Sequence, residues 1–307
     1  MKLSPIVFFA YNRPNLTIKA LSALKKNKLC KKSKIIFYID KPKEKRDIKL
    51  NNKVIEIIKK EKCFRSKKII FRKKNYGLAK NFIDGISETF KKFDKAIILE
   101  DDNLVSSSFL EFMNDSLEIY RNDKKVSCIY GYFPKTEYRL PETFFLRGSW
   151  TLTWGTAIWK RSWKLFEPNA NKLLSKIRRK NLVKDFNFDN TFDWFSMLER
   201  CKKKQNQSWS VRWYASTFLN NTFTLFPKHS LCKNIGMDGS GVNTPKTKIW
   251  DVNIFSSKIK VKKQKVVESK LAFKAAKIFL NSVEPKHKKI INSLKKFLYF
   301  KGFNLFF

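Results

Sequence analysis

The sequence has few of the residues that build common metal and redox sites. Its two histidines, His229 and His287, exclude a histidine-rich metal centre. Its five cysteines lie far apart, and no two of them form a Cys-x-x-Cys pair. An odd number of cysteines without a spacing pattern is typical of free thiols in a reducing compartment, so we expect a cytoplasmic location.

Phosphate-binding signatures and long apolar runs are also missing. The sequence contains neither Gly-x-Gly-x-x-Gly nor a Walker-type Gly-Lys-Ser/Thr, which argues against ordinary dinucleotide-binding and P-loop proteins. No apolar run approaches the roughly 18 residues that a membrane-spanning helix needs. The N-terminal SPIVFFAY is too short for a signal peptide and no small-residue cleavage site follows it, so we predict that it is a first buried strand.

Acidic residues are scarce, since 26 Asp and Glu stand against 66 Lys and Arg, for a net charge of +40. Two interpretations of this excess stay open. It can attract an anionic partner, such as nucleic acid, an acidic membrane face or a phosphorylated substrate, or it can form a solvated surface. Hydrophobic residues fill 43% of the 307 positions, which indicates a folded protein with a large core.

Short apolar runs alternate with segments of helical spacing in the first half of the chain. We expect Asn15 to cap the first helix and the serines at 106–108 to cap the fourth. The third helix is expected to bury Leu78, Phe82, Ile86 and Phe90 on one face. Strand–helix alternation predicts an α/β fold with right-handed crossovers and a mostly parallel sheet flanked by helices. The predicted strands are SPIVFFAY, SKIIFYID, KKIIFR, KAIILED and VSCIYGY.

Polar residues follow four of these predicted strands. AYNRPN follows the first, IDKPK the second, KKNYGLAKN the third and EDDN the fourth. The carboxyl ends of parallel strands meet at one edge of a sheet, where ligands bind. We therefore expect one cleft to be lined by Asn12, Arg13, Asp40, Asn75, Glu100, Asp101 and Asp102.

The acidic trio Glu100–Asp102 stands out in a basic chain. Mutual repulsion makes such a cluster costly unless a cation or a set of hydrogen-bond donors occupies it. Mg²⁺ and Mn²⁺ take oxygen ligands, commonly one or two carboxylates plus phosphate oxygens and water. A cation bound by Asp102 would grip a diphosphate and stabilise its charge as it departs, while a neighbouring acid holds a ribose hydroxyl. The alternative is a solvated turn that caps the next helix.

Five motifs occur in a fixed order between about residue 3 and residue 245. They are AYNRP at 10–14, NYGLAKN at 75–81, IILEDD at 97–102, WGTAIWKRSW at 154–163 and KNIGMDGSGVN at 233–243. This series resembles the nucleotide-sugar glycosyltransferases of the GT-A fold, and in particular the bacterial family-2-like sugar transferases. The resemblance implies a Rossmann-like GT-A fold. It also implies transfer, with inversion, from a nucleotide sugar (a UDP-sugar is favoured) to a hydroxyl of a surface glycan or lipid-linked acceptor.

The resemblance also implies roles for single residues. Arg13 and Asp40 would contact the nucleotide base or its ribose, with Asn75 nearby. Asp101 would hold the ribose, and Asp102 would ligate the Mn²⁺ or Mg²⁺ that bridges the diphosphate. The expected donor-binding set is Asn12, Arg13, Asp40, Asn75, Glu100 and Asp101.

The segment FDNTFDWFSMLER matches the place where relatives carry a tryptophan–aspartate pair, here Phe192–Asp193. Asp193 is therefore the predicted general base, with Asp189 as the second candidate; either can instead be a helix cap or a lysine partner. Relatives usually end the NIG region with a histidine, and Asn243 stands in its place. The glycines of this region suggest a mobile loop or a plain linker.

Domain boundaries and the C-terminal tail complete the prediction. Residues 1–130 would form the nucleotide-sugar-binding half, 131–250 the acceptor-binding and catalytic half, and 251–307 a basic amphipathic extension. Residues 256–307 hold fourteen lysines and two glutamates, which suits either a helix on an anionic membrane face or one packed on the domain. Most tryptophans of the 150–163 segment are expected in the core, with one or two left for a sugar-binding wall.

Two other functions compete with this interpretation. A nucleic-acid-binding basic protein would suit the charge, but the lysines are spread along the chain and no known module appears. A sugar-phosphate nucleotidyltransferase also uses metal-bound acids, but AYNRPN lacks the glycines of its phosphate loop. We expect no nucleic-acid partner and a peripheral place on the inner face of the cytoplasmic membrane.

Overall fold

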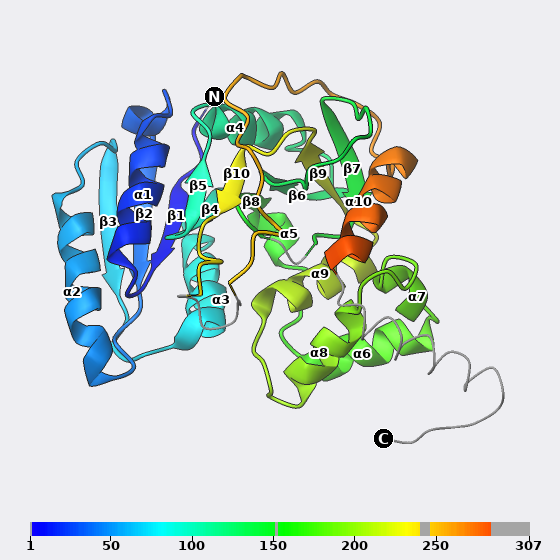
Figure 1. Cartoon of the computed structure of the whole chain (residues 1–307), viewed down its shortest axis with the longest axis horizontal. Coiled ribbons are helices and arrows are strands. Elements are labelled where there is room, and N and C mark those ends of the chain that lie inside the picture. Colours follow the sequence, from blue (N-terminus) through cyan, green and yellow to red (C-terminus); the bar gives the residue numbers. More distant parts are fainter. Residues whose placement is uncertain (1, 151–152, 240–245, 284–307) are drawn as a thin grey trace.

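The computed structural model describes residues 2–150, 153–239 and 246–283. A sheet of eight strands runs through the molecule in the order β3-β2-β1-β4-β8-β6-β9-β7, and β10 and β5 form a second, two-stranded sheet (Figure 1). The strands are β1 (Ile6–Ala10), β2 (Lys34–Ile39), β3 (Ser66–Phe71), β4 (Lys95–Glu100), β5 (Asn103–Val105), β6 (Val126–Tyr130), β7 (Thr143–Arg147), β8 (Thr156–Trp159), β9 (Phe223–Pro227) and β10 (Cys232–Asn234).

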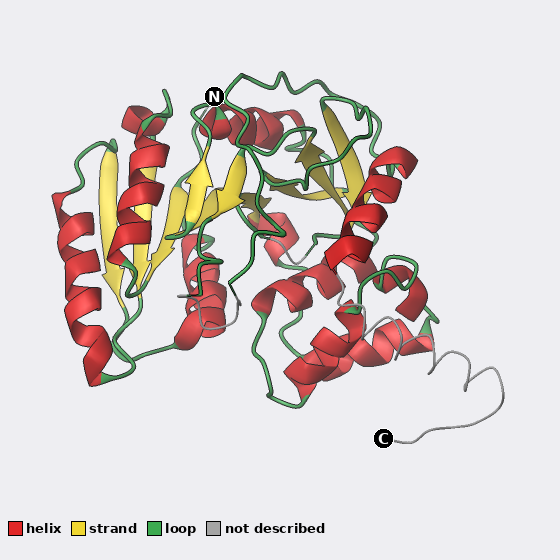
Figure 2. Ribbon diagram, in the orientation of Figure 1, coloured by secondary structure: helices red, strands yellow, loops and turns green. Residues whose placement is uncertain are grey.

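Helices flank this sheet (Figure 2). They are α1 (Pro14–Lys25), α2 (Lys45–Lys60), α3 (Gly77–Thr89), α4 (Phe109–Ile119), α5 (Lys160–Trp163), α6 (Ala170–Arg179), α7 (Val183–Phe186), α8 (Trp194–Lys202), α9 (Trp209–Leu219) and α10 (Lys270–Val283), with the 3-10 turn η1 at Cys30–Lys32. The predicted α/β fold class is confirmed.

Strands β1 to β4 are parallel, as the alternation of strands and helices predicts. The chain moves from β1 to β2 and β3, and then returns past β1 to β4. Right-handed crossovers therefore place α1 and α2 on one face of the sheet and α3 on the other. β8 runs antiparallel to both β4 and β6, and β7 runs antiparallel to β9.

Three details of the helices differ from the prediction. Asn15 is exposed and is not the cap of α1, because Pro14 at the first helical position begins the helix directly after Arg13. Ser108 is the N-cap residue of α4, but its side chain makes no capping hydrogen bond. Leu78, in the first turn of α3 and one turn before the buried Phe82, is 54% exposed.

The tryptophans of the 150–163 segment lie in the core, as predicted for most of them. Trp150, Trp154, Trp159 and Trp163 are all buried. Trp163 stacks on Phe166, with 4.6 Å between ring centroids. Trp163 also packs on Trp213 of α9, with 5.5 Å between ring centroids, so this ring belongs to the core.

The described part of the C-terminal extension packs on the domain. Residues 251–269 cross α4 and β7, where the Tyr120 hydroxyl donates to Lys262 O over 3.2 Å. Helix α10 then lies beside β7 (Figure 1), burying Ala272, Ala276 and Leu280. His287 and the lysine-rich segment that follows it lie outside the described residues. Within the described ranges, no helix combines the length and the apolar character needed to cross a bilayer.

Candidate functional site

The acidic trio lies at the carboxyl end of the buried strand β4. Glu100 is the last residue of the strand, and Asp101 and Asp102 form the turn that leads into β5. The two aspartates are 2% and 6% exposed, so the turn that they form is buried, while Glu100 is half-buried. Buried carboxylates need partners, and these partners define the site.

Arg13 bridges the two aspartates. Its Nη2 donates to Asp101 Oδ1, and its Nη1 lies 2.8 Å from Asp102 Oδ2. Arg13 sits at the end of β1, where α1 begins, so adjacent parallel strands bring the three residues together. The ends of the first and fourth strands thus lie side by side and bring these three residues into contact; that they bind a ligand stays a prediction.

The electrostatics of the trio favour an added cation. Burial raises the pKa of Glu100 to about 8, and the charge of Asp102 adds to this effect. Burial raises the pKa of Asp101 to about 6 although Arg13 opposes the rise. Burial would lower the pKa of Arg13, but its two aspartate partners raise it above the usual value. With all groups ionised, three carboxylates face one guanidinium, so the cluster keeps an excess of negative charge.

The oxygen atoms of the trio suit a hard divalent cation. Asp101 Oδ2 is buried without a hydrogen-bond partner among the described residues. Asp102 Oδ1 accepts from Asn103 Nδ2 over 2.9 Å, while Oδ2 faces Arg13. In the described ranges, no cluster of three or more His, Cys, Asp or Glu side chains is arranged to hold a metal. Carboxylates of this kind fit a cation that takes one or two of them and its other ligands from phosphate and water.

Asn103, which the sequence reasoning missed, holds the acidic turn in shape. Besides its bond to Asp102, its Oδ1 accepts from Glu100 N over 3.2 Å and from Gly155 N over 3.3 Å. Gly155 belongs to the Trp-Gly motif before β8. One buried amide thus joins the acidic turn to the second half of the chain.

Gly236 covers the Arg13–Asp102 pair. Pairing of β10 with β5 sets Asn234 opposite Asn103, and Ile235 N donates to Asp102 O over 2.8 Å. A Cβ atom at Gly236 would overlap Asp102 Oδ2 and lie 2.7 Å from Arg13 Nη1. Gly236 is needed for this close packing, which neither the mobile-loop nor the linker interpretation predicts. In the sequence, the NIG motif was the signal for this glycine.

Asp40 and Asn75 join the ends of β2 and β3. The carboxylate of Asp40 accepts from the backbone N of Tyr76 and of Gly77, each over 2.8 Å, and so binds the start of α3. Burial raises the pKa of Asp40, and these backbone hydrogen bonds oppose the rise. Asn75 Nδ2 donates to Lys41 O over 2.6 Å. Both residues shape the sheet edge; their contact with a nucleotide stays a prediction.

Asn12 is held by a residue that the sequence did not reveal. Asp47 on α2 accepts from Asn12 Nδ2 over 2.9 Å and from the Tyr11 hydroxyl over 2.8 Å. One turn later on the same helix, Asn51 Nδ2 donates to Tyr11 O and to Asp40 O. The only sequence signal was the spacing of four residues between Asp47 and Asn51.

Asp193 and Asp189 lie in the second half of the chain. Asp193 is the N-cap of α8, and its Oδ1 accepts from Ser196 N over 3.0 Å. Asp189 forms an ion pair with Lys277 of α10, with 2.8 Å between the charged atoms. Both alternatives of the sequence analysis, a helix cap and a lysine partner, are thus present. Asn243 lies outside the described residues.

No protein-family model and no curated protein matches this chain. Among solved structures, residues 1–349 of S. aureus TarS match 78% of this chain with 10% identity and a TM-score of 0.40. The complex of that fragment with UDP-GlcNAc matches 74% with 8% identity and a TM-score of 0.39.

A third match is the mannosyltransferase PcManGT from Pyrobaculum calidifontis in complex with GDP-Man and Mn²⁺. It covers 57% of this chain with 11% identity and a TM-score of 0.34. The chain spans 62% and 57% of the two TarS structures and 47% of the mannosyltransferase. The likeness of this chain to these structures is one of fold.

Proposed function

We propose that the protein is a metal-dependent glycosyltransferase that moves a sugar from a nucleotide-sugar donor to an acceptor hydroxyl. One observation carries the proposal. Arg13, Asp101 and Asp102 form a buried ion cluster at the carboxyl ends of adjacent parallel strands, and one carboxylate oxygen in it has no partner among the described residues. Such strand ends are where α/β sheets bind ligands, and the cluster has donors and acceptors for a diphosphate and a cation.

Asp102 would hold Mn²⁺ or Mg²⁺ at this edge, and Asp101 would hold the ribose of the donor. When bound, the cation supplies positive charge that stabilises the departing diphosphate. Arg13 provides a second, permanent positive charge, and its planar guanidinium suits bidentate contact with phosphate oxygens. Burial raises the pKa of Glu100 while no cation is bound. A bound cation would lower this pKa and so favour the ionised carboxylate.

Asp193 is the proposed base for the acceptor hydroxyl. Its Oδ1 is fixed by Ser196 N at the start of α8, which orients the carboxylate and leaves Oδ2 for the substrate. Oδ2 would take the hydroxyl proton as the acceptor oxygen bonds to the anomeric carbon. A single displacement of this kind inverts that carbon.

For the donor we propose a UDP-sugar, and for the acceptor a surface glycan or lipid-linked glycan. The net charge of +40 supports an anionic acceptor and a place on the inner face of the cytoplasmic membrane. We also propose that the lysine-rich C-terminal tail binds the same membrane face.

A thermal-shift panel tests the proposed function. Purified protein is heated with UDP-, GDP- and other nucleotide sugars, each with and without Mn²⁺. We expect one class of nucleotide sugar to raise the melting temperature, and only when Mn²⁺ is present. In a separate incubation, the protein should slowly hydrolyse that same donor. No response to any nucleotide sugar, together with tight and salt-sensitive binding of RNA, would overturn the proposal.

A further inference from the structure

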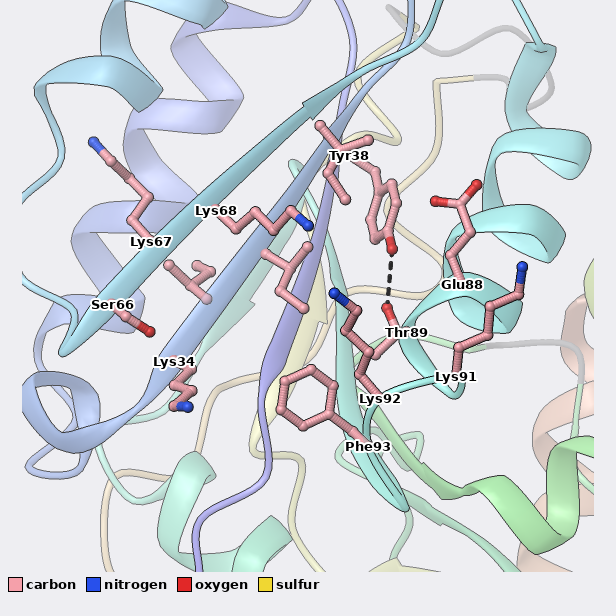
Figure 3. A pocket seen from close by; sticks show the side chains of 13 residues that line it. Lys34, Tyr38, Ser66, Lys67, Lys68, Glu88, Thr89, Lys91, Lys92 and Phe93 are labelled. Carbon is pink, nitrogen blue, oxygen red and sulfur yellow. Dashed lines mark hydrogen bonds between the residues drawn. The ribbon is translucent and has the colours of Figure 1, made fainter.

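A pocket of about 390 Å³ lies on the face of β2 and β3 opposite to α1 and α2 (Figure 3). Its position follows from the way α3 packs. A Cβ atom at Gly85 would lie 2.7 Å from Phe9 Cε1, so α3 lies tightly against β1. The end of α3 and the turn after it border this face of β2 and β3. None of the residues of the acidic trio lines the pocket, so the two are separate.

The floor of the pocket is apolar. Alternate residues of a strand face the same side, so Ile36 and Tyr38 of β2 lie on this face beside Ile70 of β3. Phe93, in the turn after α3, closes one side of the floor. The Tyr38 hydroxyl lies 3.2 Å from Thr89 Oγ1 and is thereby engaged within the protein.

The rim of the pocket is strongly basic. Lys68 from β3 and Lys92 from the turn after α3 extend toward its middle from opposite sides (Figure 3). Lys34 and Lys91 also line it, and none of these four exposed lysines forms an ion pair with any described residue. The one acid of the lining, Glu88, is bound by Arg72, whose Nη1 lies 2.7 Å from its Oε1.

We propose that this pocket binds a phosphate-bearing ligand with an apolar body. Unpaired ammonium groups on one rim repel one another, and a phosphate between Lys68 and Lys92 would relieve this repulsion through charge-assisted hydrogen bonds. The apolar body would cover Ile36, Ile70 and Phe93. The volume is in the range of pockets that enclose small ligands with a few polar groups at the edge. Such chemistry is shared by membrane phospholipids and by soluble phosphate esters.

The double variant Lys68→Gln/Lys92→Gln tests the pocket. Its matched control is Lys19→Gln/Lys53→Gln, which removes the same charge from exposed positions on α1 and α2, on the opposite face. Calorimetry measures the binding of phosphatidic acid with short chains, below its micelle concentration, and of inorganic phosphate. We expect phosphatidic acid to bind more tightly than phosphate, and the pocket variant to lose about tenfold in affinity while the control keeps it.

Several outcomes would overturn the proposal. These are no binding of phosphatidic acid, an equal loss in both double variants, and equal affinity for phosphate and phosphatidic acid. Sedimentation with phosphatidylcholine vesicles that contain phosphatidylglycerol separates the two sources of ligand. If vesicle binding falls only in the pocket variant, the site is supported and its ligand is a membrane lipid. If the pocket variant loses the short-chain phosphatidic acid but binds vesicles normally, the site is supported and its ligand is a soluble phosphate ester.

Discussion

Replacing Gly236 by alanine perturbs the acidic site through a single methyl group. The added Cβ would overlap Asp102 Oδ2 and lie 3.0 Å from Asp102 Cβ and 2.7 Å from Arg13 Nη1. Carbon atoms pack at about 3.5–4.0 Å, so either the β10 loop must retreat by roughly 1 Å or the ion pair must open. We expect overpacking of this kind to cost about 1–3 kcal/mol of folding free energy.

Binding and catalysis should suffer more than stability. Because Asp102 and Arg13 would both be displaced, we expect Gly236→Ala to abolish most of the Mn²⁺-dependent thermal shift with the nucleotide sugar. A misplacement of about 1 Å lowers a transfer rate by about a hundredfold. Calorimetric titration of Mn²⁺ and donor, followed by a transfer assay at saturating donor, measures the two effects separately.

Gly239→Ala is the matched control on the same loop. Gly239 has a φ of +92°, so alanine there is strained, but its Cβ would lie 3.7 Å from the nearest side chain, that of Lys246. The control should therefore lose about 1 kcal/mol of stability and keep donor affinity. Normal Mn²⁺-dependent donor binding in Gly236→Ala would refute the reasoning that this glycine seats the acidic cluster.

Three further predictions concern single carboxylates. Asp102→Ala should keep the fold and lose the Mn²⁺-dependent thermal shift; an unchanged shift would remove Asp102 as a metal ligand. Asp193→Asn preserves the helix cap, so donor binding and melting temperature should stay while transfer is lost; retained turnover would contradict its role as the base. Burial raises the pKa of Glu268, although a hydrogen bond from the backbone N of Arg147 opposes it. The folded state therefore binds this proton more tightly than the unfolded state, whose pKa is about 4.5. The resulting stabilisation is complete below about pH 4.5 and is lost as the pH rises through the higher pKa of the folded state. Urea unfolding of Glu268→Gln should show a weaker fall in stability over that range; identical pH profiles would contradict this.

The first half of the fold could be predicted because its signals are local. Each of β1 to β4 is a short apolar run, and parallel strands joined by helices allow few arrangements. The order of β8, β6, β9 and β7 had no such signal. β8 inserts antiparallel between β4 and β6, a pairing decided by contacts between residues far apart in the sequence.

The candidate site divides in the same way. Arg13, Asp101 and Asp102 were predictable because strand ends in a parallel sheet share one edge. Asp47 and Gly236 had only weak signals, the four-residue spacing to Asn51 and the NIG motif. Their places depend on the rotation of α2 and on the pairing of β10 with β5, which residue spacing does not determine.

Strand β8 has a consequence for any attempt to divide the chain near residue 130. A fragment ending there would present the open side of β4 to solvent, with its backbone groups ready to pair with another molecule. It would also lack the backbone amide of Gly155 and Gly236, which packs against Asp102 and Arg13. We would therefore expect such a fragment to aggregate, and nucleotide capture to require both parts of one continuous polypeptide.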